Sequence, residues 1–207
     1  MDTPEQPQIY LITPADFEIG SFPQRLARVL DAQPVACVRL ALASRDEDRV
    51  ARAADALREV THARDVALVI ADHLLMVERL GLDGVHLSDA ARSVRYARKT
   101  LGEESIVGSF CGPSRHDGMA AGEAGADYVS FGPLQASSLD DGRFAEEDLF
   151  QWWSEVIEVP VVAEGALDAQ IVSRLAPYTD FFGIGAEIWD NDDPAAALAT
   201  LTAAMSG

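Results

Sequence analysis

GADYVSFGP, at residues 125–133, carries the pattern that decides the fold: a glycine and an aspartate at the end of a helix, then a short apolar strand. GLDGVHL, at residues 81–87, has the same pattern, and DFF at residues 180–182 echoes it more weakly. Glycine suits the turn after a helix because it adopts left-handed backbone angles without strain. The spacing of the copies therefore indicates a repeated strand–helix unit.

The rest of the chain extends this alternation of strands and helices. We expect strands at 9–13, 36–42, 66–70, 84–87, 106–110, 128–131, 160–163 and 181–184. We expect helices near 22–31, 46–63, 73–80, 89–100, 114–124, 146–157, 168–176 and 194–205. Strands that alternate with helices are typical of a parallel sheet, and strands this apolar should be buried on both faces. An open doubly wound sheet would also alternate, but eight strands with no sign of a second domain favour one α/β domain, a (β/α)8 TIM barrel over residues 1–207.

Composition and charge narrow the possible partners. The chain is 48% hydrophobic and 24% charged, which is ordinary for a globular domain. Its formal charge of −18 repels nucleic acid and anionic membranes. Residues 1–8 have neither the basic nor the apolar part of a signal peptide, and we expect them to form a flexible tail. The two cysteines, Cys37 and Cys111, suggest no disulfide framework. We therefore expect a cytoplasmic protein with a small-molecule ligand, no nucleic-acid or membrane partner, and scope for a homo-oligomer.

Several segments resemble the thiamine phosphate synthases and their thiazole tautomerase relatives over nearly the whole chain. These are IYLIT at 9–13, VIADH at 69–73, DGVHL at 83–87, GADYVSFGP at 125–133 and VPVVA at 159–163. The resemblance implies that an aminopyrimidine methyl pyrophosphate loses pyrophosphate and is attacked by a thiazole phosphate nitrogen. Mg²⁺ and cationic side chains should stabilise the departing charge, and in a barrel they should lie at the carboxyl ends of the strands.

The cationic positions that this resemblance implies are changed. After the second strand the family has a Gln-x-Arg-x-Lys pattern, whereas residues 39–43 read RLALA. Arg39 then stands at the glutamine position as a candidate substrate ligand, with Arg45 nearby, although Arg39 could instead be a structural ion-pair partner. The family's Thr-x-Thr-Lys phosphate loop after strand six corresponds to Ser137 and the residues SLD that follow it. Arg143 could partly replace the missing lysine.

For Mg²⁺, the resemblance implies carboxylates after the third and fourth strands. Asp72 aligns with the first, and Asp89 lies two residues before the position of the second. Two carboxylates are enough for Mg²⁺, because water and phosphate complete its coordination shell. Asp72 has the alternative role of an N-cap for the next helix.

Strands seven and eight of a barrel usually bind phosphate through glycine amides. Gly165, Gly185 and Ala186 preserve that open backbone, whereas Glu164 and Glu187 add negative charge beside it. If both glutamates point inward, the pocket suits a neutral or cationic ligand better than a phosphate ester. His86, in the fourth strand, is a further candidate substrate ligand, with a packed structural role as the alternative.

Three functions follow from this pattern. The first is a divergent thiamine phosphate synthase whose activity is weak or absent because the cationic positions are lost. A second is a non-catalytic binding or regulatory barrel that keeps the ring pocket. A third is a barrel enzyme for a neutral or cationic ring, in which Glu164 and Glu187 act as acid, base or counter-ion.

Overall fold

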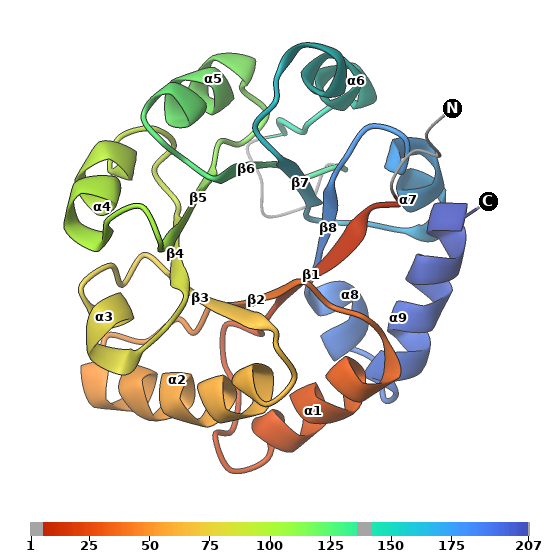
Figure 1. Ribbon diagram of the computed structural model, residues 1–207. Coiled ribbons are helices and arrows are strands. Elements are labelled where there is room, and N and C mark those ends of the chain that lie inside the picture. The colour runs from red at the N-terminus through yellow and green to blue at the C-terminus, as the bar shows by residue number, and fades with distance from the viewer. Residues whose placement is uncertain (1–5, 136–141, 207) are drawn as a thin grey trace.

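The computed structural model describes residues 6–135 and 142–206, which form a closed barrel of parallel strands ringed by helices (Figure 1). The strands are β1 (Gln8–Ile12), β2 (Cys37–Leu40), β3 (Ala67–Ala71), β4 (Gly84–Leu87), β5 (Ile106–Phe110), β6 (Tyr128–Phe131), β7 (Val161–Glu164) and β8 (Phe181–Ile184). The helices are α1 (Phe22–Ala32), α2 (Glu47–His62), α3 (Met76–Leu80), α4 (Val94–Leu101), α5 (Arg115–Glu123), α6 (Glu147–Val156), α7 (Ala169–Leu175), α8 (Ala186–Trp189) and α9 (Pro194–Ala203), followed by a short 3-10 turn at Ala204–Ser206. Because β8 pairs with β1, the ring closes and the expected barrel is confirmed.

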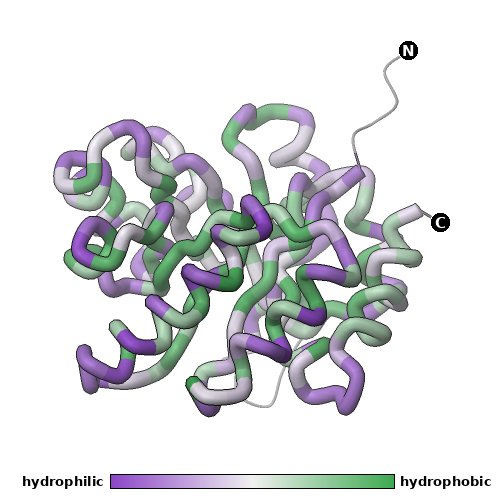
Figure 2. Tube along the Cα trace, turned by 60° about the horizontal axis from the view of Figure 1, so that its bottom comes forward, coloured by the Kyte–Doolittle hydropathy of each residue, from purple (hydrophilic) through white to green (hydrophobic). Residues whose placement is uncertain are grey.

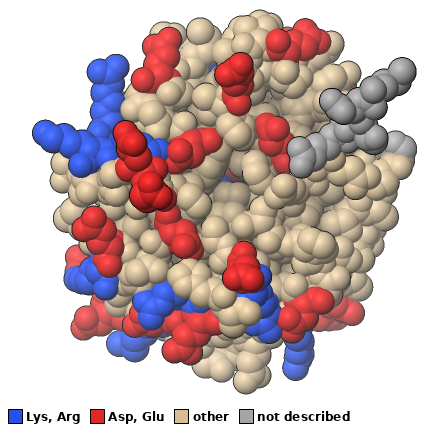
Figure 3. Space-filling view, viewed as in Figure 1, with Lys and Arg blue, Asp and Glu red and all other residues tan. Residues whose placement is uncertain are grey.

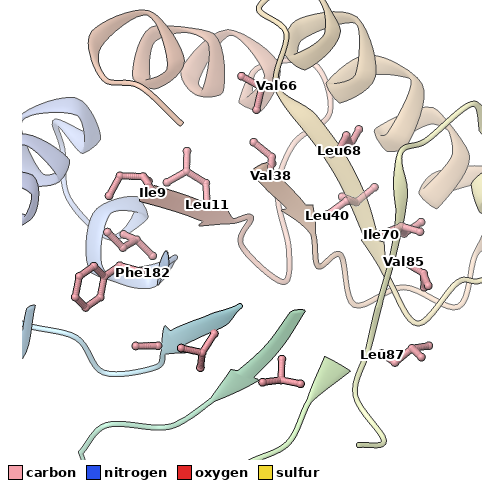
Figure 4. Packing of buried hydrophobic residues seen from close by; sticks show 14 of the residues in the cluster. Ile9, Leu11, Val38, Leu40, Val66, Leu68, Ile70, Val85, Leu87 and Phe182 are labelled. Carbon is pink, nitrogen blue, oxygen red and sulfur yellow. The ribbon is translucent and has the colours of Figure 1, made fainter. Parts of the chain in front are cut away.

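Side chains on each strand alternate between the helices and the lumen. Leu11, Val38, Leu68 and Val85 point outward into the layer between strands and helices, which forms the main hydrophobic core (Figure 4). Figure 2 shows the same division, with hydrophobic residues along the strands and hydrophilic ones mostly on the outer turns. The inward positions between them carry both apolar and polar side chains, so the lumen is the place to look for chemistry.

The repeated glycine–aspartate pattern has a clear structural purpose at the amino ends of the strands. Asp83 accepts a hydrogen bond from the Leu68 amide at 2.7 Å, and Asp127 accepts one from the Val107 amide at 2.7 Å. Asp180 accepts one from the Val161 amide at 2.8 Å. Each aspartate precedes an even-numbered strand and binds a residue at the start of the odd-numbered strand before it. The repeat therefore joins neighbouring strands in pairs.

Several boundaries differ from the sequence-based expectation, most of them by one or two residues. β1 begins at Gln8, because the Gln8 amide donates to the Asp180 carbonyl at 2.9 Å and residue 8 pairs with Phe181. α3 and α4 begin several residues later than expected, after irregular turns at the ends of β3 and β4. The sequence analysis also missed α8, a four-residue helix directly after β8. It has too few residues to show a helical periodicity.

The described residues include no helix that is long and apolar enough to cross a membrane. The surface is strongly acidic, in keeping with the formal charge of −18. On the face shown in Figure 3, acidic side chains are spread over the surface and basic ones lie mainly toward its edge.

Candidate active site

A pocket of about 370 Å³ opens at the carboxyl ends of β1, β7 and β8. Its lining includes Ile12, Glu164, Gly165, Gly185 and Glu187. The glycines expected from the sequence are therefore brought together here, with both glutamates beside them. The pocket lies where barrels commonly place their ligands.

Arg39 is the central cation of this mouth, and it is already paired. Its guanidinium extends from β2 into the lumen and forms a two-pronged ion pair with Glu164 of β7, in which one contact, Nη1 to Oε1, measures 3.2 Å. The two side chains are only 8% and 13% exposed. Burial is the largest single influence and lowers the pKa of Arg39, but the charge of Glu164, its hydrogen bond and the two tyrosines together outweigh burial and hold that pKa well above its usual value. Arg39 thus makes the kind of ion pair that the sequence analysis considered as its structural alternative.

A chain of hydrogen bonds leads from Arg39 across the lumen. Arg39 Nε donates to the Tyr10 hydroxyl at 3.1 Å, which lies 2.6 Å from the Tyr128 hydroxyl. That hydroxyl lies 2.9 Å from His86 Nδ1. Burial raises the pKa of both tyrosines, while burial and then the positive charge of Arg39 lower the pKa of His86 well below its usual value. His86 is therefore a neutral imidazole at neutral pH.

Glu187 binds the main chain at the ends of β7 and β8. Its Oε1 accepts from the Leu167 amide at 3.1 Å, and its Oε2 accepts from the Gly185 amide at 2.8 Å. One carboxylate thus bridges the two loops that commonly bind phosphate in barrels. The charge of Glu187 therefore lies between these two loops.

Asp72 and Asp89 follow adjacent strands on the other side of the mouth. Asp72 has a left-handed φ of 59°, and its carboxylate accepts from the Ser88 amide and the Ser88 hydroxyl, both at 2.8 Å. Asp72 does not cap α3, which begins at Met76 with Leu75 as its N-cap, so the N-cap alternative is wrong. Asp89 accepts from Ser93 Oγ at 2.5 Å. Its other oxygen, Oδ1, is buried and has no hydrogen-bond partner among the described residues.

The donor chemistry of these two carboxylates fits Mg²⁺, which prefers carboxylate oxygens. Asp72 is exposed and oriented by Ser88, and Asp89 has a buried oxygen to spare. The described residues contain no group of three or more His, Cys, Asp or Glu side chains placed to hold a metal. Any Mg²⁺ here would have to take most of its ligands from water and substrate.

Comparisons with known proteins agree with this architecture. The profile described as thiamine monophosphate synthase matches residues 9–184. The chain belongs to the thiamine monophosphate synthase family. The thiamine-phosphate synthase of Rhodospirillum centenum is 38% identical over 203 residues, which cover 97% of this chain and 98% of that protein. The thiamine-phosphate synthase of Erythrobacter litoralis is 40% identical over 198 residues, which cover 93% of this chain and 92% of that protein.

Solved structures show the same fold. The thiamine phosphate pyrophosphorylase of Pyrococcus furiosus superposes with a TM-score of 0.81 at 19% identity, covering 96% of this chain and 95% of that one. A 3-hexulose-6-phosphate synthase superposes with a TM-score of 0.69 at 15% identity, covering 95% of this chain and 99% of that one. At such identities the likeness concerns the barrel and carries no function to this chain.

Within this family fold, the remaining sequence-based candidates are dispersed. Ser137 lies outside the described residues. Arg143 is among the described residues and is exposed. Arg45 is also exposed, in the loop between β2 and α2. Ala186 lines the pocket as expected. Cys111 is a buried thiol whose pKa burial raises to about 12, in line with its ordinary role as a packed side chain.

Tyr10 and Tyr128 are the residues of the site that the sequence analysis missed. Both lie at inward positions of their strands, as do Arg39 and His86. Polar side chains at alternating inward positions of several strands are a signal that could have found them. Nothing in the sequence, however, gives the partners within the lumen, because these depend on how the barrel closes.

Proposed function

We propose that this barrel binds the unphosphorylated ring alcohols related to the family's substrates, and that it catalyses the pyrophosphate-releasing coupling weakly or not at all. The observation that carries the proposal is that carboxylates already occupy the groups that could bind phosphate at this side of the mouth, which are one guanidinium and two backbone amides. Arg39 is paired with Glu164, and Glu187 is bound to the amides of the β7 and β8 loops.

The energy of a phosphate in this pocket supports the proposal. A carboxylate about 4 Å from a phosphate raises its energy on the order of 4 kcal/mol at an effective dielectric constant of 20. Glu164 and Glu187 both line the pocket. Preorganised positive charge is usually the largest contribution to reactions that release an anion. The only cation of the described residues that reaches into this part of the lumen, Arg39, donates to Tyr10 and Glu164.

Mg²⁺ remains part of the proposal, with Asp72 and Asp89 as the residues that would hold it. When bound, it would neutralise charge on a pyrophosphate. In this chain Asp72 would be kept in place by its two bonds to Ser88, and Asp89 would offer its buried oxygen. Neither residue replaces the cations missing on the opposite side, so we expect Mg²⁺ to give little synthase activity.

The carboxylates do not favour the third function, an acid–base enzyme built on Glu164 and Glu187. Glu164 is held by a guanidinium and Glu187 by two amides. The oxygens of both carboxylates are engaged in these contacts, which is a poor starting point for proton transfer. The acidic lining that remains, with Glu187 and Asp190 beside the ion pair, supports a small ligand without negative charge in a cytoplasmic protein.

Two measurements test the proposal. Calorimetry should show that the aminopyrimidine and thiazole alcohols bind and that their phosphate esters bind no more tightly. A coupling assay with both phosphorylated precursors and Mg²⁺, with Asp72→Ala as control, should give little thiamine phosphate. Mg²⁺-dependent turnover at about 1 per second or faster, lost in Asp72→Ala, would mean that the proposal is wrong.

A further inference from the structure

Two buried polar atoms in the lumen lack a partner. His86 Nε2 and Ser130 Oγ have no hydrogen-bond partner among the described residues, and their side chains belong to residues that are 2% and 0% exposed. Leaving such a group unsatisfied costs about 1–3 kcal/mol. Buried polar atoms usually gain a partner from the protein, from water or from a ligand, so these two mark a place where something binds.

The direction of the hydrogen-bond chain decides which proton His86 carries. Arg39 can only donate, so the Tyr10 oxygen accepts from Arg39 Nε. The Tyr10 proton then goes to the Tyr128 oxygen, and the Tyr128 proton goes to His86 Nδ1. A neutral imidazole that accepts at Nδ1 carries its proton on Nε2. His86 therefore presents Nε2–H as a donor.

The opposite direction leaves a proton without an acceptor. If His86 Nδ1 donated to Tyr128 and Tyr128 donated to Tyr10, the Tyr10 oxygen would accept twice. The Tyr10 proton would then have no acceptor among the described residues, at a position that is 2% exposed. An unsatisfied buried donor costs free energy, which disfavours the reversed direction of the hydrogen-bond chain.

The two unsatisfied atoms are closed off from solvent and belong to inward-facing residues near the carboxyl ends of β4 and β6. The strand partner of His86 is Ala71 on β3, and the strand partner of Ser130 is Phe110 on β5. Both partners are half-buried, in contrast to the deeper lumen residue Val69, which is fully buried. A ligand seated over Ala71 and Phe110 would meet His86 and Ser130 next. At the level of His86, the inward residue of β5 is Gly108, which leaves room for the Tyr128 ring beside His86.

We infer that His86 Nε2–H and Ser130 Oγ form a donor pair that recognises an unprotonated ring nitrogen of a neutral heteroaromatic ligand. This inference rests on the proposed function and names the ring atom that the protein recognises. His86 supplies a fixed donor because Tyr128 holds its other nitrogen. Ser130 can donate or accept and so adapts to a second polar atom on the ring. A protonated ring would be rejected, because it presents a donor to a donor near the charge of Arg39.

The first test is the tautomer itself, which needs no ligand. Long-range nitrogen–proton NMR correlations on the labelled full chain should show His86 as the neutral Nε2–H form from about pH 5 to 8. Tyr10→Phe should disturb this form, because it breaks the chain between Arg39 and Tyr128. An Nδ1–H tautomer, or a charged ring, in the unmodified protein would overturn the inference whatever the protein binds.

The second test uses a matched pair of probes: the aminopyrimidine alcohol and its phenyl analogue, in which carbon replaces both ring nitrogens. We expect the pyrimidine to bind about tenfold more tightly, equivalent to one hydrogen bond. His86→Phe should remove this preference, and Ser130→Ala should reduce it. Ser109→Ala, a substitution on the outward side of β5, should leave it unchanged.

The outcomes separate the inference from the proposed function. If both rings bind equally to the unmodified protein, His86 and Ser130 hold an internal water only and the inference is wrong, while ring binding stands. If neither ring binds, the proposed function and the ligand assignment both fail. A preference for the pyrimidine that persists in the His86→Phe variant would show that another residue recognises the ring nitrogen. This result would also overturn the inference.

Discussion

The two sides of the barrel mouth treat their polar groups in opposite ways. On one side, which we call the paired wall, Arg39, Glu164 and Glu187 satisfy one another or the main chain. On the other, the unpaired wall, His86 and Ser130 each keep a buried atom without a partner among the described residues, as does Asp89. A ligand gains most binding free energy where it forms hydrogen bonds with groups that the fold leaves without a partner. The comparison supports the proposal that recognition rests on the unpaired wall, because the groups of the paired wall already have partners.

The largest effect should come from breaking the paired wall. Glu164→Ala leaves the Arg39 charge buried and should lower the free energy of unfolding by about 3–5 kcal/mol. The double variant Arg39→Met/Glu164→Leu should recover much of this loss, because no charge is then left unpaired. Urea denaturation measures both. A single variant that costs less than about 1 kcal/mol would show that the pair behaves as a surface ion pair.

The next effect should come from crowding the unpaired wall. A Cβ at Gly108 would lie 2.0 Å from Tyr128 Cζ, so Gly108→Ala must push the tyrosine ring away from His86. Overpacking of this kind costs about 1–3 kcal/mol. Thermal unfolding should show the loss, and the preference for a ring nitrogen should fall with it. Gly20→Ala is the control, since nothing lies within 4 Å of its Cβ.

The contrast between the walls also explains how much the sequence could predict. The barrel follows from patterns that are local: apolar strands, helix-ending glycines, and aspartates such as Asp83 and Asp127 that bind the neighbouring strand. Gly165 and Gly185 were likewise expected at the mouth and line its pocket. The pairing of Arg39 with Glu164 was not predictable, because it joins residues 125 positions apart on strands β2 and β7, which β1 and β8 separate in the ring.

The position of Glu187 was equally beyond sequence reasoning. Its contact with the Leu167 amide depends on the short helix α8, which periodicity could not reveal. From the sequence, the charge of Glu187 was the only reason at this position to doubt phosphate binding. The structure supplies the stronger reason, which is that this carboxylate is bonded to the amides of both loops.

A smaller effect should follow when Glu187 is removed. Glu187→Ala frees the Leu167 and Gly185 amides and should cost about 1–2 kcal/mol of stability, as the loss of a side-chain cap does. It should also raise the affinity for a thiazole phosphate relative to the thiazole alcohol, measured by calorimetry. Asp190→Ala is the matched control, because it removes one charge from the same pocket lining without freeing either amide. Equal results from the two variants would mean that net charge alone excludes phosphate.

The smallest effect is a pH dependence that belongs to the unpaired wall. Burial and then Arg39 lower the pKa of His86 in the folded protein, so below about pH 6.5 the unfolded chain binds a proton that the folded chain does not. Stability should therefore be unaffected above that pH and should fall as the pH drops below it, by up to about 1.4 kcal/mol per pH unit. Because carboxylates also titrate toward acid, the quantity to measure is the difference between the unmodified protein and His86→Gln in urea denaturation. A difference that stays constant between about pH 5 and 8 would mean that His86 binds its proton over the same pH range in the folded and the unfolded chain, and the unpaired wall would then have no fixed neutral tautomer below about pH 6.5.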